Sequence, residues 1–391
     1  MTNASLVDRI VEAVRSVVPA DAAPAPLHAP EFRGAEKAYL ADCVETGWVS
    51  SVGAYVDRFE RDLEALTGAA RAVAVVNGTA ALDVCLRLAG VQPGDEVLVP
   101  ALTFVATANA VTYRGATPHF VDSEDVTLGV DPVRLDAYLD RIARVTDGGC
   151  VNRHTGAPIR ALIAMHVFGH PCDLDGLIEV ADRWRLVLVE DAAEALGSRW
   201  RGRHAGTSGR LGALSFNGNK IVTTGGGGAV LTDDPELGRR AKHLTTTAKV
   251  PHAWAFDHDE IGWNYRLPNL NAALGCAQLE QLERMIARKR ALARRYADAF
   301  AAAEGVTLLA PREGAEVNHW LNALILDEPD FATRDAVLEA LNGAGFGARP
   351  LWTLMHRLPM YSACPRDELP TAEGLAARVI NLPSSAALAD A

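Results

Sequence analysis

The sequence predicts a large α/β domain with a mainly parallel sheet, followed by a smaller α+β domain. From residue 71 onward, short apolar runs alternate with amphipathic segments that have helical periodicity. The apolar runs are continuous, which is typical of strands covered by helices on both faces, and their alternation with helices makes a sheet largely parallel. A long charged segment at about 271–304 then leads to a C-terminal part in which strand and helix patterns are mixed.

The elements are expected in a definite order. A helix at about 5–17 and a linker rich in Pro and Ala come first, and helical patterns at 31–45 and 55–66 follow on either side of a loop at 46–53. Strands are expected at 72–76, 96–99, 119–121, 161–165, 186–189, 213–216, 229–231 and 321–326. Further helices are expected at 80–88, 104–113, 132–145, 174–185 and 334–343. We therefore divide the chain into an N-terminal helix and linker (1–30), a large domain (31–270) and a bridging helix with a small domain (271–391).

Composition and charge indicate an ordinary soluble protein. Of the 391 residues, 49% are hydrophobic and 22% are charged, and the net charge is -11, which disfavours nucleic acid and anionic membranes as main partners. The longest uncharged run, 97–113, contains Pro100 and Asn109 and is not expected to span a membrane. The six cysteines form no CxxC pair, and the charged N-terminal segment is not a signal peptide, so we expect a cytoplasmic protein.

Lys220 lies between an apolar run at 213–216 and four successive glycines at 225–228. The apolar run is expected to be a buried strand, and the glycines indicate backbone that bends freely or passes close to a bulky group. A lysine in an apolar pocket loses affinity for its proton and can attack a carbonyl group. A surface lysine after a strand is the more common arrangement, so the neighbouring motifs must decide between the two.

Motifs at the ends of three predicted strands favour an aromatic cofactor that carries a phosphate. Gly78 and Thr79 open a helix after the first strand, where free N–H groups and the helix dipole attract an anion, although Thr79 could also be a plain N-cap. Asp191 ends the fifth strand, where a buried carboxylate either meets a cation, such as the protonated pyridine nitrogen of pyridoxal 5′-phosphate (PLP), or caps the next helix. Phe104 follows the second strand and either stacks on a flat ring or belongs to the core.

Two further groups complete this pattern. Ser215 precedes Lys220 by five residues and is a candidate phosphate ligand, and the segment 262–266, which includes Asn264, supplies more hydrogen-bond donors. A phosphate site, an aromatic cover, a carboxylate and a late lysine then occur in the order in which a PLP enzyme uses them. This order favours a reactive Lys220 over a surface one.

The chain resembles the DegT/StrS-type sugar-nucleotide aminotransferases, which are PLP enzymes of the aspartate-aminotransferase (type I) fold, over about residues 24–386. The segments that carry the resemblance are TGWVSSVGAYVDRFE, VVNGTAALDVCLRLAGVQPGDEVLVPALTFVATANAV, HVFGHPCDLD, VEDAAEALGS, SFNGNKIVTTGGGG, IGWNYRLPNLNAALGCAQLEQL and HRLPMY. The resemblance implies that Lys220 holds the cofactor covalently and carries a proton during catalysis. It also implies that Asp191 pairs with the pyridine nitrogen and that Phe104 stacks on the ring.

The same resemblance assigns the remaining cofactor contacts. Gly78, Thr79 and Ser215 are expected to bind the phosphate, and Asn264 is expected to reach this site from a second subunit, so a homodimer is implied. Glu194 and Asn217 are also counted as cofactor-binding candidates. Many family members have Gln or His in place of Glu194 and His in place of Asn217, which leaves the contact to the phenolic oxygen of the cofactor open. Because Lys220 is present, the dehydratase variants of the family are disfavoured.

Within the family, the leading helix and the segments SFNGNK, TTTAKVPHAW and NHWLNALILD resemble the legionaminic-acid and bacillosamine (LegC-type) branch. This implies transfer of an amino group from L-glutamate to C4 of a UDP-linked 4-keto-6-deoxy-N-acetylhexosamine. The product would be a UDP-4-amino-4,6-dideoxy-N-acetylglucosamine-type sugar for a surface glycan. The alternatives are an aminotransferase for another nucleotide sugar, such as a GDP-perosamine-type enzyme, and a non-catalytic PLP-binding regulator. The regulator is disfavoured because the chain has no basic DNA-binding module.

Four more residues are candidates for contact with the substrate: Trp48, His166, His319 and His356. His166 follows a strand in HVFGHPCD, and because this spacing matches no common zinc site, no metal is expected. His319 and His356 lie on loops that face the sugar in the family that the chain resembles, although both could instead be structural histidines.

Overall fold

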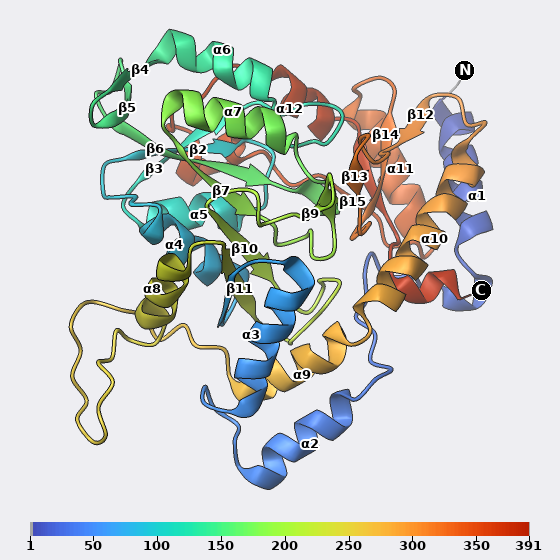
Figure 1. The fold of residues 1–391 in the computed structure, drawn as a ribbon. Helices are drawn as coiled ribbons and strands as arrows, with labels where there is room; N and C mark the ends of the chain where they lie inside the picture. The colour runs from blue at the N-terminus through green and yellow to red at the C-terminus, as the bar shows by residue number, and fades with distance from the viewer. Residues whose placement is uncertain (1–2, 391) are drawn as a thin grey trace.

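The computed structural model describes residues 3–390 and confirms the predicted α/β fold with a mainly parallel sheet. In spatial order, the main path of the sheet is β1 (Arg71–Val75), β11 (Gly228–Thr232), β10 (Leu211–Ser215), β7 (Val187–Asp191), β6 (Pro158–Met165), β2 (Glu96–Pro100) and β3 (Thr117–Val121) (Figure 1). All pairs from β10 to β3 are parallel, whereas β11 runs antiparallel to both of its neighbours. The carboxyl ends of the parallel strands therefore meet at one edge, where ligands bind in open α/β sheets.

Helices cover both faces of this sheet. On one face lie α6 (Pro132–Ile142) and α7 (Leu174–Trp184), and on the other lie α4 (Gly78–Leu88), α5 (Val105–Tyr113) and α8 (Pro235–Thr245) (Figure 1). Alternate residues of β6 enter separate apolar cores: Leu162 belongs to the core under α6 and α7, and Ile163 to the core on the opposite face. This two-sided burial explains why the strands read as continuous apolar runs.

Polar side chains fix where these helices begin. Asp131, Asp173 and Asp234 accept hydrogen bonds from backbone N–H groups at the starts of α6, α7 and α8, and Asn77 does the same for α4. Such caps satisfy donors that have no partner within the helix.

The C-terminal part forms a smaller antiparallel sheet with the order β12 (Val306–Leu308), β14 (Asn322–Leu326), β16 (Val379–Leu382) and β15 (Arg349–Pro350). Around it pack α10 (Leu282–Phe300) and α11 (Phe331–Gly343). The N-terminal helix α1 (Asn3–Val17) contacts both of these helices and buries Ile10 and Val14 in a third apolar core (Figure 1). Although α1 begins the chain, it packs against the small domain near the C-terminus.

Two of the expected helices differ clearly in the structure. The expected bridging helix is divided into α9 (Asn269–Leu279) and α10, and the side-chain amide of Gln281 at the break donates to Glu36 Oε1, at the start of α2 (Glu36–Thr46), at 2.7 Å. The expected helix at 132–145 ends at Ile142, and the chain continues into the hairpin of β4 (Ala143–Thr146) and β5 (Gly149–Asn152). Between α8 and α9, the segment 246–268 has no helix or strand and forms a loop that projects from the domain (Figure 1).

The remaining elements are short or peripheral. They are α3 (Ala54–Thr67), α12 (Pro370–Ala376), β8 (Arg199–Trp200), β9 (Arg203–His204), β13 (Ala315–Glu316), and the 3₁₀ turns η1 (Ala20–Ala22), η2 (Val167–Gly169), η3 (Met355–Arg357), η4 (Pro359–Tyr361) and η5 (Ala386–Ala389). Within residues 3–390, none of the helices is long and apolar enough to cross a membrane.

Candidate active site

A cavity of about 320 Å³ opens where the carboxyl ends of β7 and β10 meet the start of α4. Its size is within the usual range for a small-molecule site. The predicted residues that line it are Gly78, Thr79, Phe104, Asp191, Glu194, Ser215, Asn217 and Lys220. Side chains from segments more than 100 residues apart in the sequence therefore face one another here.

The anion site is built by a close approach between α4 and β10. A Cβ atom on Gly78 would lie 2.8 Å from the Cβ of Ser215, so only glycine allows the start of α4 to lie against this strand. The N-terminal end of α4, Thr79 and the Ser215 hydroxyl then face the cavity together. The helix dipole and the hydroxyl groups make this corner suitable for a phosphate.

Asp191 presents a buried carboxylate to the cavity. It is the last residue of β7 and is 2% exposed, and it accepts hydrogen bonds from Thr107 Oγ1 at 2.7 Å and from the backbone N–H of Ala193 at 3.2 Å. Burial raises the pKa of Asp191, while these hydrogen bonds and the charge of Lys220 oppose the shift. Among the described residues, no cationic side chain forms an ion pair with Asp191. A cationic ligand group is therefore the partner that would stabilise its charge.

Lys220 lies beside a second buried carboxylate. Its Nζ is 3.3 Å from Glu194 Oε1 and 4.0 Å from the centre of the Trp320 ring. The other oxygen of Glu194 accepts the backbone N–H of Phe168 at 2.8 Å. Burial raises the pKa of Glu194 to about 7, and the charge of Lys220 opposes this shift. The amine therefore has a neighbour that can exchange a proton near neutral pH.

Comparison with known proteins shows the family of this chain. A model described as the DegT/DnrJ/EryC1/StrS aminotransferase family matches residues 30–391. The chain belongs to this family. GDP-perosamine synthase of Caulobacter vibrioides is 36% identical over 365 residues, which cover 93% of this chain and 94% of the relative. Spore coat polysaccharide biosynthesis protein SpsC of Bacillus subtilis is 32% identical over 366 residues, 90% of each chain.

The fold agrees with this assignment. The crystal structure of the aminotransferase TlmJ from Streptoalloteichus hindustanus superimposes with a TM-score of 0.83 at 29% identity, over 92% of this chain and 93% of that one. The family and fold expected from the sequence are confirmed. The protein is a PLP-dependent aminotransferase that acts on nucleotide sugars.

The cavity fits the cofactor of this aminotransferase. The space left by Gly78 beside Ser215 suits a phosphate, and the buried Asp191 lacks the cation that a protonated pyridine nitrogen would supply. Lys220 faces the same cavity, where it can bind a carbonyl carbon covalently. The phosphate, the ring nitrogen and the aldehyde carbon of PLP would therefore each have a complementary group in the cavity.

The aromatic wall of the cavity combines one predicted and two unpredicted residues. Phe104 is half-exposed at the start of α5, and the ring of Trp352 lies 6.4 Å from it, centre to centre. Trp320 lies beneath Lys220, and its Nε1 donates to the backbone oxygen of Asn219 at 2.8 Å. Both tryptophans come from the C-terminal part of the chain, and no local motif marks them as site residues.

Three of the four substrate candidates lie outside the cavity for clear physical reasons. His166 is fully buried directly after β6. Its Nε2 is 2.9 Å from Glu190 Oε2, and its Nδ1 accepts the backbone N–H of Cys172 at 3.1 Å. His319 faces a different cavity between α10 and the small sheet, and its ring packs against His170. His356 is held by Glu373 at 3.3 Å. None of these three histidines lines the cofactor cavity, and their contact with the substrate stays a prediction.

Trp48 and Asn264 are also absent from the lining of this cavity, but both are exposed. Trp48 lies in the loop after α2. Asn264 lies in the projecting loop, and its Oδ1 accepts a hydrogen bond from Arg266 Nε at 3.0 Å. Their positions leave both side chains available to a neighbouring subunit.

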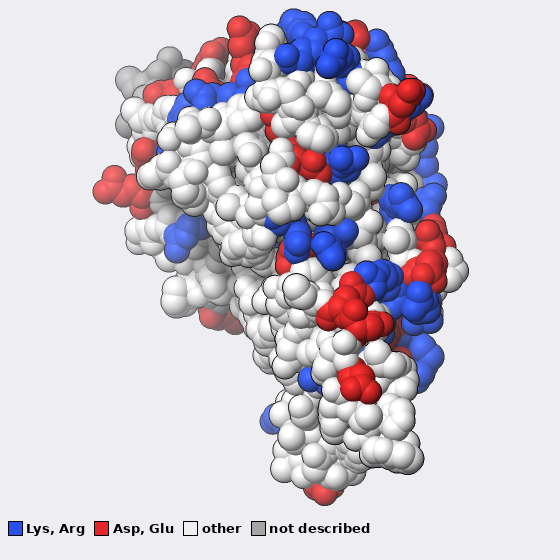
Figure 2. Space-filling model, turned by 90° about the vertical axis from the view of Figure 1, so that its left-hand side faces the viewer, with Lys and Arg blue, Asp and Glu red and all other residues white. Residues whose placement is uncertain are grey.

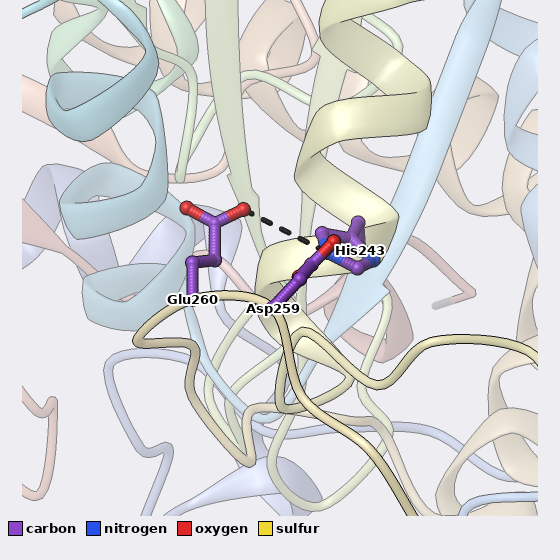
Figure 3. Close-up of side chains that lie close together, drawn as sticks. All are labelled: His243, Asp259 and Glu260. Carbon is purple, nitrogen blue, oxygen red and sulfur yellow. Dashed lines mark hydrogen bonds and ion pairs between the residues drawn. The ribbon is translucent and has the colours of Figure 1, made fainter.

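A second cluster with metal-ligand side chains lies at the base of the projecting loop. His243 Nε2 is 2.7 Å from Asp259 Oδ1 and 3.6 Å from Glu260 Oε1 (Figure 3). Glu260 also binds Arg240, whose Nη2 is 2.6 Å from Glu260 Oε2. These charges already compensate one another, so the cluster is explained as a set of ion pairs that fastens the loop to α8.

Proposed function

We propose that this aminotransferase moves an amino group from L-glutamate to the C4 ketone of a nucleotide-linked 4-keto-6-deoxyhexose. The observation that carries the proposal is that Lys220 and Asp191 face one cavity from two neighbouring strands or their ends, with an anion site beside them. A transaminase needs this combination, because one group must bind a carbonyl carbon and another must hold a positive charge on the cofactor ring.

In this proposal each side chain has a separate task. When bound, PLP would supply a ring that accepts electrons as a proton is removed from the α-carbon of the amino donor. Asp191 would hold a proton on the ring nitrogen of the cofactor, and Lys220 would bind the cofactor and, once free, carry the proton taken from the donor. The start of α4 and Ser215 hold the phosphate. Phe104 covers the ring and reduces its exposure to water.

The nucleotide is the finer part of the proposal. GDP-perosamine synthases from Caulobacter vibrioides and other bacteria are among the relatives. This similarity supports a GDP-linked substrate for this chain. The UDP-linked 4-keto-6-deoxy-N-acetylhexosamine remains the second candidate. It is supported by the segments SFNGNK, TTTAKVPHAW and NHWLNALILD, which resemble the legionaminic-acid and bacillosamine branch of the family.

Two measurements test this function. The absorption spectrum of the purified protein is expected to show a PLP band that shifts to the pyridoxamine form when L-glutamate is added. Amination of UDP- and GDP-linked 4-keto sugars, assayed side by side, then identifies the nucleotide. A protein that stays colourless with added PLP contradicts the proposal, and preference for the UDP sugar would reverse the order of the two candidates.

A homodimer is also part of the proposal. Large apolar side chains are exposed on the loop after α2 and on the projecting loop, and the lower part of the molecule, where these segments lie, carries few charged side chains (Figures 1 and 2). The exposed residues are Trp48, Val49, Val52, Trp254, Phe256 and Ile261. Several large exposed apolar side chains on neighbouring loops of one subunit are consistent with an interface, and such an interface would carry Asn264 toward the site of the second subunit. Sedimentation is expected to give a dimer, and an active monomer would contradict this arrangement.

The Glu194→Gln variant is expected to remove a pH-dependent contribution to the stability of the apoprotein. Because the pKa of Glu194 is raised to about 7 from its ordinary value of 4.5, folding favours the neutral carboxyl group, and this contribution is lost as the pH rises toward 7. The loss is on the order of 3 kcal/mol. Urea unfolding of both proteins from pH 4.5 to pH 8 should therefore show the wild type losing stability relative to the variant. Parallel curves would show that Glu194 does not titrate in this range.

A further inference from the structure

A second cavity, of about 370 Å³, shares Asn219, Trp320 and Trp352 with the lining of the cofactor cavity. It lies between the linker after α1, which supplies His28, and the small sheet, which supplies Asn381. The two cavities therefore adjoin. The roles proposed above for the cofactor-binding residues do not explain the polar groups of this second cavity.

Two of its polar atoms have no partner. Both His28 Nδ1 and Asn381 Oδ1 are shielded from solvent, and neither has a hydrogen-bond partner among the described residues. Asn381 is 3% exposed, and its Nδ2 faces the backbone oxygen of Pro350 at 3.5 Å, which leaves Oδ1 as the unpaired acceptor. A buried polar atom without a partner costs about 1–3 kcal/mol. A ligand that donates a hydrogen bond to each atom would remove this cost.

His28 also presents an acceptor. Burial lowers its pKa well below the ordinary value, the charges of Lys289 and Lys220 act in the same direction, and the backbone of Asn219 opposes them. A neutral imidazole has one nitrogen with a free lone pair. His28 and Asn381 therefore form a pair of acceptors, which favours hydroxyl groups and disfavours the carboxylates of the amino donor.

The other walls have different chemistry. Phe168, Trp320 and Trp352 form an aromatic wall, with the ring of Phe168 5.3 Å from Trp352 and 6.5 Å from Trp320, centre to centre. Arg349 lines the cavity and is exposed. Its Nη1 donates to Ala348 O at 2.9 Å, and within residues 3–390 it forms no ion pair with an acidic side chain. Flat apolar walls suit the C–H face of a sugar ring, and an unpaired guanidinium suits a phosphate.

We propose that this second cavity binds the hexose ring of the nucleotide sugar. Two hydroxyl groups of the ring, or one hydroxyl and the amide N–H of an N-acetyl sugar, donate to His28 Nδ1 and Asn381 Oδ1. The ring packs against Trp352, and the diphosphate is directed toward Arg349. The shared wall brings the carbon to be aminated next to the cofactor cavity. This assignment rests on the proposed function, and it names the residues that select the sugar.

The test separates the two half-reactions by their absorption changes. The His28→Phe and Asn381→Leu variants keep side-chain size and remove the acceptor. The PLP form is mixed with L-glutamate, and the pyridoxamine form is mixed with whichever UDP- or GDP-linked 4-keto sugar the wild type aminates. Each variant is expected to raise the apparent Kd for the sugar about tenfold, the equivalent of one lost hydrogen bond. The donor half-reaction should stay within about twofold of the wild type.

Three controls keep the outcomes distinct. His154→Phe replaces an exposed histidine in the turn after β5 and should change neither half-reaction. His28→Asn places an amide near the position of Nδ1 and should recover part of the sugar affinity, which a purely structural role for the ring would not predict. If a leucine or phenylalanine variant fails to fold, this conservative variant and the Arg349→Gln variant still test the site. Arg349→Gln should weaken binding of the nucleotide sugar without changing the donor step.

The results then fall into clear classes. The hexose site would be overturned if the variants kept the sugar affinity of the wild type, or if they lost affinity equally for the sugar and for L-glutamate. Either result would leave the aminotransferase function intact. A wild-type protein that accepts L-glutamate but aminates neither sugar would overturn the proposed substrate class, and the hexose assignment with it. Selective loss of sugar affinity in the variants, with partial recovery in His28→Asn, supports the site.

Discussion

Replacing Lys220 with alanine is expected to lower the rate of transamination by at least about a thousandfold, which corresponds to roughly 4 kcal/mol of transition-state stabilisation. The substitution removes the amine that holds the cofactor and the same amine that carries the proton, so both functions are lost together. The amine lies between Glu194 and the ring of Trp320, and among the described residues no other lysine lines this cavity.

Steady-state assays with L-glutamate and the preferred nucleotide sugar measure this loss. Lys242→Ala is the matched control, because Lys242 pairs with Glu60 away from the cavity, and its substitution should leave the rate nearly unchanged. Added ethylamine should restore part of the activity of Lys220→Ala by replacing the missing proton carrier. A Lys220→Ala protein with near-normal turnover would refute the assignment of this lysine.

The position of Lys220 could be predicted because the signals that mark it are local. An apolar strand, a short turn and a run of glycines are contiguous in the sequence, and the same is true of β7 and Asp191. Strand ends in a parallel sheet share one edge, so residues at those ends converge even when they are distant in the chain. The fold and the main site residues therefore follow from short-range patterns together with one topological rule.

His166 shows that a position at a strand end does not decide which face of the sheet a side chain occupies. It follows β6 directly, as an active-site residue would, but side chains alternate along a strand. Met165 lines the cofactor cavity, so His166 points to the opposite face and meets Glu190. The position of the strand end could be predicted, but the face on which each side chain lies could not, because an error of one residue reverses that face.

The sequence patterns do not predict Trp320 and Trp352 as residues of the cavity, for a different reason. They belong to the small domain, and their approach to Lys220 depends on how that domain packs against the large one. His319, which lies beside Trp320, faces away into a separate cavity. No pattern within a single segment contains this information, because the packing angle is decided by the buried surfaces of both domains.

The Asp191→Asn variant is expected to retain the fold and lose about 10²–10⁴-fold in rate. Asparagine has nearly the same shape, and Thr107 can accept a hydrogen bond from the new amide instead of donating to an oxygen, since the Thr103–Thr107 pair can reverse its direction. The amide carries no negative charge, so the ring nitrogen of the cofactor would lose the partner that keeps it protonated.

Two readouts distinguish this role from a structural one. Removing a buried charge that has no cationic partner in the apoprotein should leave its free energy of unfolding unchanged or raise it, while turnover with the cofactor bound falls steeply. Thr107→Val removes one hydrogen bond to Asp191 and keeps the carboxylate, and it should cost only about tenfold in rate. If Asp191→Asn destabilised the apoprotein and lowered the rate no more than Thr107→Val does, Asp191 would be a packing residue and the charge on the cofactor ring would have to be held by another group.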